Sequence, residues 1–254
     1  MTRRVYRASA LAGWIGVIVL FALILSDNAV RQAVVTAVSQ WPETIRLILA
    51  ALGGYVIGSI PIGFLAVGVL TERDVRNEGS GRTGGTNAYR AGGFLGGFLT
   101  IVGDFLKGMC AIVLGALILP NIWSPVLSGL GGVLGHNASI FLAFRGGAGT
   151  ISNMGAVTAF WPPALLFIAP VFVLGMFVIR IASVASIIMN SGVVILFLAL
   201  VLFAGYPWPI IVYAVGALLL SMYALRPNID RLRKGTEPHV PPIRIFKRAQ
   251  HGRS

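Results

Sequence analysis

The segment 78–90 combines glycines, small hydroxyl side chains and arginines within thirteen positions, which read EGSGRTGGTNAYR. Glycines let successive backbone N–H groups turn into one concave surface that binds anions. Hydroxyl groups add donors, and an arginine can hold a phosphate with two parallel hydrogen bonds. A flexible basic loop that touches anionic lipid is the alternative reading of the same composition. The residues predicted to bind phosphate are Ser80, Gly81, Arg82, Gly84, Thr86, Asn87 and Arg90.

The spacing Gly79-x-Gly81-x-x-Gly84 also matches the letters of a dinucleotide-binding fingerprint. That fingerprint requires a strand of a βαβ unit before it, whereas here an apolar segment of membrane-helix length precedes it. The lysine of a P-loop is missing as well. The match therefore does not predict a nucleotide site.

A second glycine-rich basic segment occurs at 144–150 and reads FRGGAGT. It is expected on the same side of the membrane as the first. Two such segments on one side favour an anion site to which Arg145, Gly146 and Gly147 contribute. The alternative is a tight turn whose arginine only fixes the topology.

Asp104 and Lys107 lie inside an apolar stretch, three residues apart, so that they share one face of a helix and can form an ion pair. Charges at membrane depth are costly unless they are paired or hydrated, and they usually mark function. Lys107 can therefore face a substrate phosphate while it is paired. A neutralised pair that only adjusts packing is the alternative.

His136 follows a glycine run near the inner end of its predicted helix. It is the candidate for a general base, with a hydrogen-bonding role equally open. Phe141 stands five positions later, so the His-x4-Asp arrangement of many acyltransferases is absent. No residue cluster suggests a metal site.

Ser183, Ser186 and Asn228 complete the predicted binding residues. The serines follow Arg180 at the expected start of a helix, where a serine usually caps the helix but can also help to hold an anion. Asn228 lies in the basic stretch 226–232. The alternative is that the charges of this stretch only fix the orientation of the chain in the membrane.

The composition places all of these residues in a membrane. Of the 254 residues, 56% are hydrophobic and only 11% are charged, which is too little polar material for the surface of a soluble domain. We therefore expect an all-α polytopic membrane protein, with no role in binding nucleic acid despite the net charge of +12. Eight apolar segments are long enough to be helices, namely 8–25, 46–70, 92–119, 123–144, 151–160, 163–179, 184–204 and 209–225.

The basic residues of the connections alternate along the chain. Arginines precede the first segment, follow the second and recur near residues 145, 180 and 226, whereas the connections 120–124, 161–163 and 205–208 carry no charge. By the positive-inside rule the basic connections and both termini are cytoplasmic. The even number of segments agrees with this orientation. We expect an anchor helix and connection over 1–45, a membrane domain over 46–226 and a basic cytoplasmic tail over 227–254.

Six motifs follow one another in a fixed order. They are Gly58-Ser59-Ile60-Pro61-x-Gly63, Gly79-Ser80-Gly81-x-x-Gly84-x-Thr86-Asn87, Asp104-x-x-Lys107-Gly108, Gly135-His136-Asn137 with Phe141-Leu142-x-Phe144-Arg145-Gly146-Gly147-x-Gly149, Ser183-x-Ala185-Ser186-Ile187, and Asn228-Ile229-x-Arg231-Leu232. Together they resemble the acyl-phosphate:glycerol-3-phosphate acyltransferases, the PlsY family, over roughly residues 47–237.

The resemblance implies a seven-helix core in the bacterial inner membrane, to which the first helix is an addition. Such an enzyme transfers a fatty acyl group from acyl phosphate to the 1-hydroxyl of glycerol 3-phosphate, giving lysophosphatidic acid and phosphate. It needs no cofactor, coenzyme A or acyl carrier protein, and the donor's phosphate is taken to assist the proton transfer. In this chain Ser80 would hold one phosphate, and Arg90, Ser186 and Asn228 would hold the acceptor.

The chain departs from the family pattern at four positions. The family usually has Asn at Arg82, Ala at Gly85 and Lys at Ala148, and it often has His at Leu225. Arg82 or Arg145 can restore the charge of the missing lysine. The alternatives are a different acceptor, lipid binding without catalysis, and transport of an anionic solute.

Overall fold

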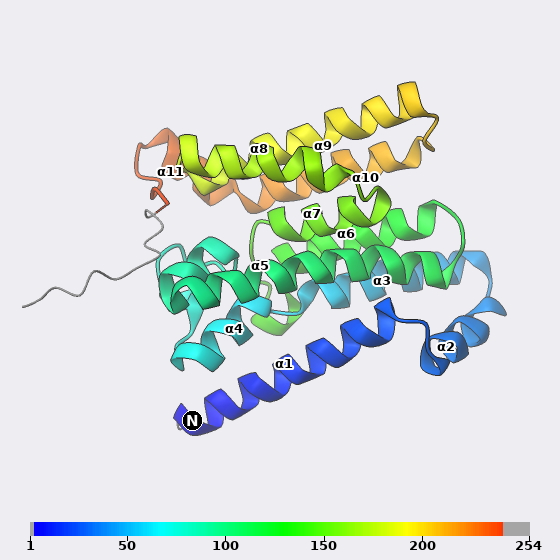
Figure 1. Cartoon of the computed structure of the whole chain (residues 1–254), viewed down its shortest axis with the longest axis horizontal. Helices are drawn as coiled ribbons and strands as arrows, with labels where there is room; N and C mark the ends of the chain where they lie inside the picture. The colour runs from blue at the N-terminus through cyan, green and yellow to red at the C-terminus, as the bar shows by residue number, and fades with distance from the viewer. Residues whose placement is uncertain (1–2, 241–254) are drawn as a thin grey trace, which may run out of the picture.

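The computed structural model describes residues 3–240, which form helices and loops without a strand (Figure 1). Arg244, Lys247, Arg248 and Arg253 of the predicted basic tail lie outside the described residues. In chain order the helices are α1 (Arg3–Leu25), α2 (Ala29–Ser39), α3 (Glu43–Ser59), α4 (Ile62–Thr71), α5 (Gly85–Ile118), α6 (Trp123–Asn137), α7 (Thr150–Phe160), α8 (Ala164–Val178), α9 (Ala182–Ala204), α10 (Pro209–Ala224) and α11 (Arg226–Arg233), with 3-10 turns η1 (Val75–Asn77) and η2 (Ile140–Leu142).

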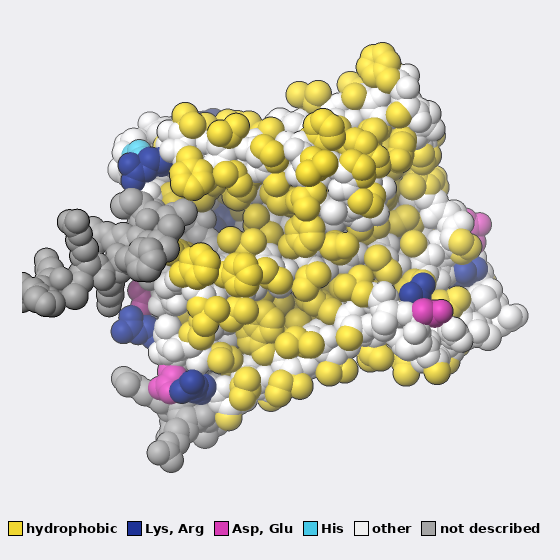
Figure 2. Space-filling model, in the orientation of Figure 1, with side chains coloured by type: hydrophobic (Ala, Val, Ile, Leu, Met, Phe, Trp, Pro, Cys, Tyr) yellow, Lys and Arg dark blue, Asp and Glu magenta, His cyan; other side chains and the backbone are white. Residues whose placement is uncertain are grey.

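A band of hydrophobic side chains crosses the middle of the molecule, and charged side chains lie towards its two ends (Figure 2). Within residues 3–240, α1, α5, α9 and the pair α3–α4 are long and apolar enough to cross a membrane, and α10 and α11 reach that length only together, across a bend of 59°. Each of the eight predicted segments coincides with a helix or a helix pair. The prediction of an all-α polytopic membrane protein is therefore confirmed.

The predicted segment 46–70 is two helices rather than one. The chain breaks at Ile60 and Pro61, between α3 and α4. Proline has no N–H group and its ring clashes with the preceding turn, so it interrupts the ladder of helical hydrogen bonds. The side chain of Lys107 compensates in part, because its Nζ donates to the carbonyl oxygen of Ile60 over 2.9 Å.

Helix α5 begins at Gly85, seven residues before the predicted segment. Gly93 interrupts it with φ 67° and ψ −162°, a conformation that only glycine adopts readily. The turns before this break, residues 85–92, therefore form a separate short helix that follows directly on the first glycine segment. This helix carries Thr86, Asn87 and Arg90.

Glycines allow α3 and α6 to cross with their backbones in contact. A Cβ atom at Gly54 would collide with the carbonyl oxygen of Ser128, and one at Gly58 with that of Gly132. Close approach of this kind is how small residues stabilise helix pairs in membranes.

The largest buried cluster lies among α6, α7, α9 and α10, with Phe197 and Tyr213 fully buried at its centre. A chain of polar contacts runs through it. The hydroxyl of Tyr213 donates to Asn153 Oδ1 over 2.6 Å, and Asn153 Nδ2 donates to Asn190 Oδ1 over 2.7 Å. These bonds join α7, α9 and α10, and so fix the direction of α7.

Helix α1 packs along α4 and α5, where Val17, Phe21 and Ile24 meet Ile57 and Ile62. Helix α2 lies in the predicted connection and has no buried residue. In Figure 1 the start of α1 and the whole of α11 lie at the same end of the bundle, and α2 lies at the opposite end. The described start and end of the chain are therefore on one side.

Candidate active site

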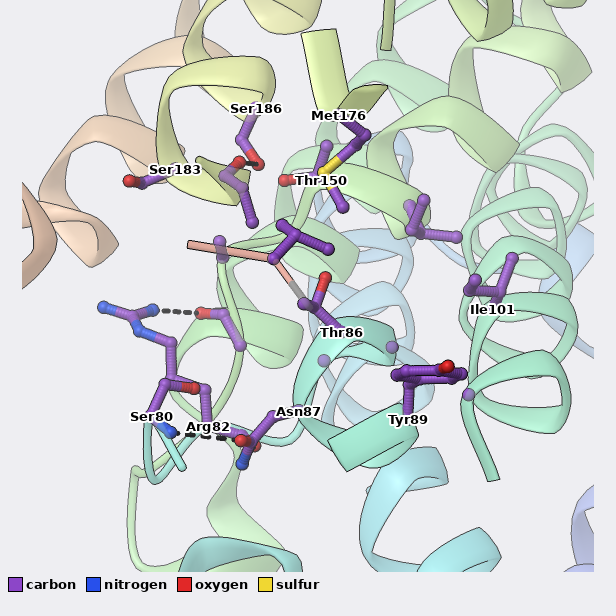
Figure 3. Close-up of a pocket in the computed structure, with 18 of the residues that line it drawn as sticks. Ser80, Arg82, Thr86, Asn87, Tyr89, Ile101, Thr150, Met176, Ser183 and Ser186 are labelled. Carbon is purple, nitrogen blue, oxygen red and sulfur yellow. Dashed lines mark hydrogen bonds between the residues drawn. The ribbon is translucent and has the colours of Figure 1, made fainter. Parts of the chain in front are cut away.

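A cavity of about 310 Å³ lies where the two glycine segments meet (Figure 3). One wall is polar and the other is apolar; in the close-up Ser80, Arg82, Ser183 and Ser186 face Tyr89 and Ile101 across it. The polar wall includes Ser80, Arg82, Thr86, Arg90, Thr150, Ser183, Ser186, Asn228 and Glu237. The apolar wall includes Phe94, Phe98, Ile101, Phe172 and Met176.

The first glycine segment is folded around the buried side chain of Asn87. Its Oδ1 accepts from the Ser80 backbone N–H over 3.0 Å, and its Nδ2 donates to the carbonyl oxygens of Val75, Glu78 and Arg82 over 2.8–3.0 Å. Asn87 lines the cavity, and its amide group forms the hydrogen bonds that shape the loop.

Arg82 bridges the two glycine segments. Its Nη1 donates to the carbonyl oxygen of Gly147 over 3.1 Å, and its Nη2 donates to that of Ala224 at the end of α10. Burial lowers the pKa of the Arg82 guanidinium; Arg231 adds to this effect and Glu237 opposes it. Because the pKa of arginine is so high, Arg82 stays positively charged in the polar wall.

The second glycine segment leads into the first turn of α7. Gly149 adopts φ 77° before the helix, and among residues 3–240 the buried hydroxyl of Thr150 has no hydrogen-bond partner. The free N–H groups and dipole of a helix start attract anions. This end of α7 therefore adds positive potential to the cavity.

Glu237 lines the polar wall and connects three of its neighbours. Its Oε1 accepts from Ser183 Oγ over 2.9 Å and from Asn228 Nδ2 over 2.7 Å, and its Oε2 accepts from Arg231 Nε over 2.8 Å. Glu237 was not among the predicted residues, because it lies in a basic stretch that reads as a tail. Ser186 instead donates to the carbonyl oxygen of Ala182 over 2.7 Å.

Asp104 and His136 line the floor of the cavity, and Lys107 lies beneath them. The predicted ion pair is present, with Lys107 Nζ 2.9 Å from Asp104 Oδ1. His136 Nδ1 lies 3.6 Å from the same oxygen. The carboxylate nearest to His136 thus comes from another helix, α5, at a distance longer than a hydrogen bond.

Most of the predicted residues come together in the cavity. Those that line it are Ser80, Arg82, Gly84, Thr86, Asn87, Arg90, His136, Gly147, Ser183, Ser186 and Asn228. Those that do not line it are Gly81, Lys107, Arg145 and Gly146. Arg145 is exposed, and Lys107 is engaged beneath the floor.

Comparison with known proteins identifies the fold and the family. The family model described as glycerol-3-phosphate acyltransferase matches residues 48–235. This chain belongs to that family. A glycerol-3-phosphate acyltransferase of a Synechococcus strain is 36% identical over 200 residues, which cover 78% of this chain and 96% of that protein. One from Geotalea daltonii is 37% identical over 205 residues, which cover 79% and 98%.

Solved structures of this acyltransferase family share the architecture. Crystal structures of PlsY (YgiH), an integral membrane glycerol 3-phosphate acyltransferase, superpose with a TM-score of 0.68 and 34% identity for the glycerol 3-phosphate form, covering 77% of this chain and 96% of that one. The lysophosphatidic acid form gives 0.66 and 32%, covering 76% and 94%. Helices α1 and α2 precede residue 48, where the family match begins.

Proposed function

We propose that the chain transfers a fatty acyl group from acyl phosphate to the 1-hydroxyl of glycerol 3-phosphate and releases lysophosphatidic acid and phosphate. Its relatives are named for the acceptor, and the two solved structures are described as forms with the acceptor and with the acylated product. The reaction is the first acylation in phospholipid synthesis. The names of the relatives do not state the donor, so acyl phosphate as the donor is part of this proposal.

The polar wall supports the binding of phosphate groups. Arg82 and Arg90 supply positive charge, and the first turn of α7 supplies backbone N–H groups. Ser80 and Thr86 add hydroxyl donors from the first glycine segment. Donors that are fixed before the ligand arrives bind a phosphate without having to be reorganised.

The apolar wall supports the binding of an acyl chain. Phe94 and Phe98 stack with ring centroids 6.0 Å apart and leave 69% and 50% of their surfaces exposed. An acyl chain can therefore enter from the lipid while its phosphate meets the glycine segments. The observation that carries the proposal is that one cavity holds both walls.

The chemistry is a single acyl transfer. The 1-hydroxyl oxygen attacks the carbonyl carbon of the acyl phosphate, a new ester C–O bond forms, and the C–O bond to the phosphate breaks. The departing phosphate takes the hydroxyl proton, so that no other reactant is needed. Positive groups in the polar wall stabilise the charge on the leaving phosphate.

We further propose that the cavity faces the cytoplasm of a bacterium and that the membrane is the inner membrane. The connections at this end carry Arg73, Arg76, Arg82 and Arg90, and the short connections at the opposite end lack charge. Residues 1–45 would form an added anchor, 46–226 the membrane enzyme and 227–254 the cytoplasmic tail.

The test is an assay of purified full-length protein in detergent with palmitoyl phosphate and radiolabelled glycerol 3-phosphate. We expect equal amounts of phosphate and labelled lysophosphatidic acid. Palmitoyl-coenzyme A replaces the donor in one control, and glycerol replaces the acceptor in another; neither should give product. Transfer from coenzyme A alone would refute the proposed donor, and acylation of glycerol in preference to glycerol 3-phosphate would refute the proposed acceptor.

A further inference from the structure

Three ionisable side chains form a buried network beneath the second glycine segment. Asp104 and Lys107 on α5 and His136 on α6 expose only 3%, 3% and 4% of their side chains. Asp104 Oδ1 lies 2.9 Å from Lys107 Nζ and 3.6 Å from His136 Nδ1. Among the described residues, Arg82 of the first glycine segment is another charged group near the imidazole.

The backbone of the second segment is fitted closely to His136. The N–H of Gly147 donates to the carbonyl oxygen of His136 over 3.0 Å. A Cβ atom at Gly146 would collide with that same carbonyl oxygen, and one at Gly147 would collide with Nε2 of the imidazole. The ring therefore occupies the space that a side chain at residue 147 would need.

This contact extends to the polar wall of the cavity. The carbonyl oxygen of Gly147 accepts from Arg82 Nη1 over 3.1 Å. A shift of the imidazole would move the backbone of Gly147 and, through it, the guanidinium group that faces the ligand. Asp104 Oδ1 lies next to both Lys107 Nζ and His136 Nδ1, and its 3.6 Å distance to the imidazole is a charge contact longer than a hydrogen bond.

We propose that His136 is a positioning residue, held by the Asp104–Lys107 pair, that sets the position of Gly147 and thereby of Arg82 in the anion site. The inference rests on the proposed function, because glycerol 3-phosphate is the ligand whose binding reports on Arg82. It differs from a role for His136 as general base, which would act on kcat rather than on acceptor binding.

Steady-state kinetics of His136→Ala, His136→Gln and the matched control His239→Gln separate these roles. His239 is exposed, and its side chain does not line the cavity. We expect His136→Ala to raise KM for glycerol 3-phosphate roughly tenfold with kcat within about threefold. His136→Gln, which keeps a polar group beside Gly147 but does not titrate, should keep the wild-type pH profile of kcat.

A paired substitution tests the contact itself. Gly147→Ala should weaken acceptor binding strongly, because the new methyl group meets the imidazole. In the His136→Ala background the ring is gone, so Gly147→Ala should cost much less, which is non-additivity between touching residues. Equal costs in both backgrounds would overturn the proposal. So would a fall in kcat of about a hundredfold or more in His136→Gln with KM unchanged, because that result would make His136 the base.

Hydrogen exchange gives a readout that does not depend on catalysis. Peptides that cover residues 144–150 should exchange faster in His136→Ala and Asp104→Asn than in wild type, and His239→Gln should leave them unchanged. Unchanged exchange in an active protein would refute the positioning role. The wild-type protein could also fail to transfer the acyl group while exchange is still faster in the variants. That result would refute the proposed function and support the positioning role.

Discussion

Removal of the Arg82 guanidinium is the most informative single change to the polar wall. Arg82→Ala deletes the two hydrogen bonds to the carbonyl oxygens of Gly147 and Ala224, and it deletes one of the positive charges that line the cavity. It leaves the hydrogen bonds of Asn87 to the other loop atoms in place, because Asn87 bonds to the backbone carbonyl of residue 82. The loop should therefore keep its shape while the site loses charge.

The expected magnitude follows from the type of bond that is lost. A charge-assisted hydrogen bond contributes about 1.5–3 kcal/mol. Each 1.4 kcal/mol corresponds to about one decade in affinity, so loss of one phosphate contact should raise KM for glycerol 3-phosphate roughly ten- to hundredfold. The effect on kcat should be smaller if the acceptor's phosphate is bound equally in the ground and transition states.

Ala148 is the second position for a double-mutant test with Arg82. It lines the cavity beside Gly147, at the position where the resemblance to the family implies a lysine. Ala148→Lys should lower KM for glycerol 3-phosphate about tenfold. In the Ala148→Lys background Arg82→Ala should raise KM for glycerol 3-phosphate less, because the new lysine supplies a positive charge in place of the arginine. The assay is phosphate release from palmitoyl phosphate, measured against glycerol 3-phosphate concentration in all four proteins.

Additivity decides the outcome. If the effects of Arg82→Ala and Ala148→Lys add within about 0.5 kcal/mol, the two positions do not share a phosphate and the reasoning is refuted. If none of the four proteins transfers the acyl group, a different acceptor or a non-catalytic relative becomes the better reading.

Three further expectations follow from the same site. Arg90→Ala and Ser80→Ala should reduce turnover sharply in a folded protein, with only partial rescue by Arg90→Lys because an ammonium group cannot form two parallel bonds; near-normal rates in Arg90→Ala would favour a loop that merely touches lipid. Arg82→Cys, made with the buried Cys110 changed to Ser, should resist an impermeant thiol reagent outside intact cells, and labelling there would reverse the topology. Glu237→Gln removes a carboxylate shared by three side chains and should lower Tm by about 5 °C in a thermal melt, whereas an unchanged Tm would show that the contacts do not stabilise the fold.

The helices and the glycine segments could be predicted because their signals are local. Apolar length marks the spans, and clustered glycines with Ser80 and Arg90 mark the proposed anion site within a few positions of each other. The ion pair of Asp104 and Lys107 could be predicted for the same reason, because both lie on one turn of a helix.

What could not be predicted depends on contacts between distant segments. Asp104 reaches His136 from another helix, and Arg82 reaches Gly147 across 65 positions of the sequence. Glu237 folds back onto Ser183, 54 positions away, and one acidic residue in a basic stretch gives no sign of this. The interruption of the second span could have been expected from Pro61, since proline inside an apolar helix is a local signal.

The break at Pro61 has a consequence for how the chain enters the membrane. The carbonyl oxygen of Ile60 accepts from the N–H of Ile62 over 3.0 Å and from Lys107 Nζ, which belongs to the next span, over 2.9 Å. Before the two spans meet, Lys107 lacks this acceptor, and a lysine at the centre of a span costs about 2.5–3.5 kcal/mol during insertion by the translocon. The span of α5 should therefore insert poorly by itself and efficiently after α3 and α4, which makes the order of synthesis part of how this enzyme is assembled.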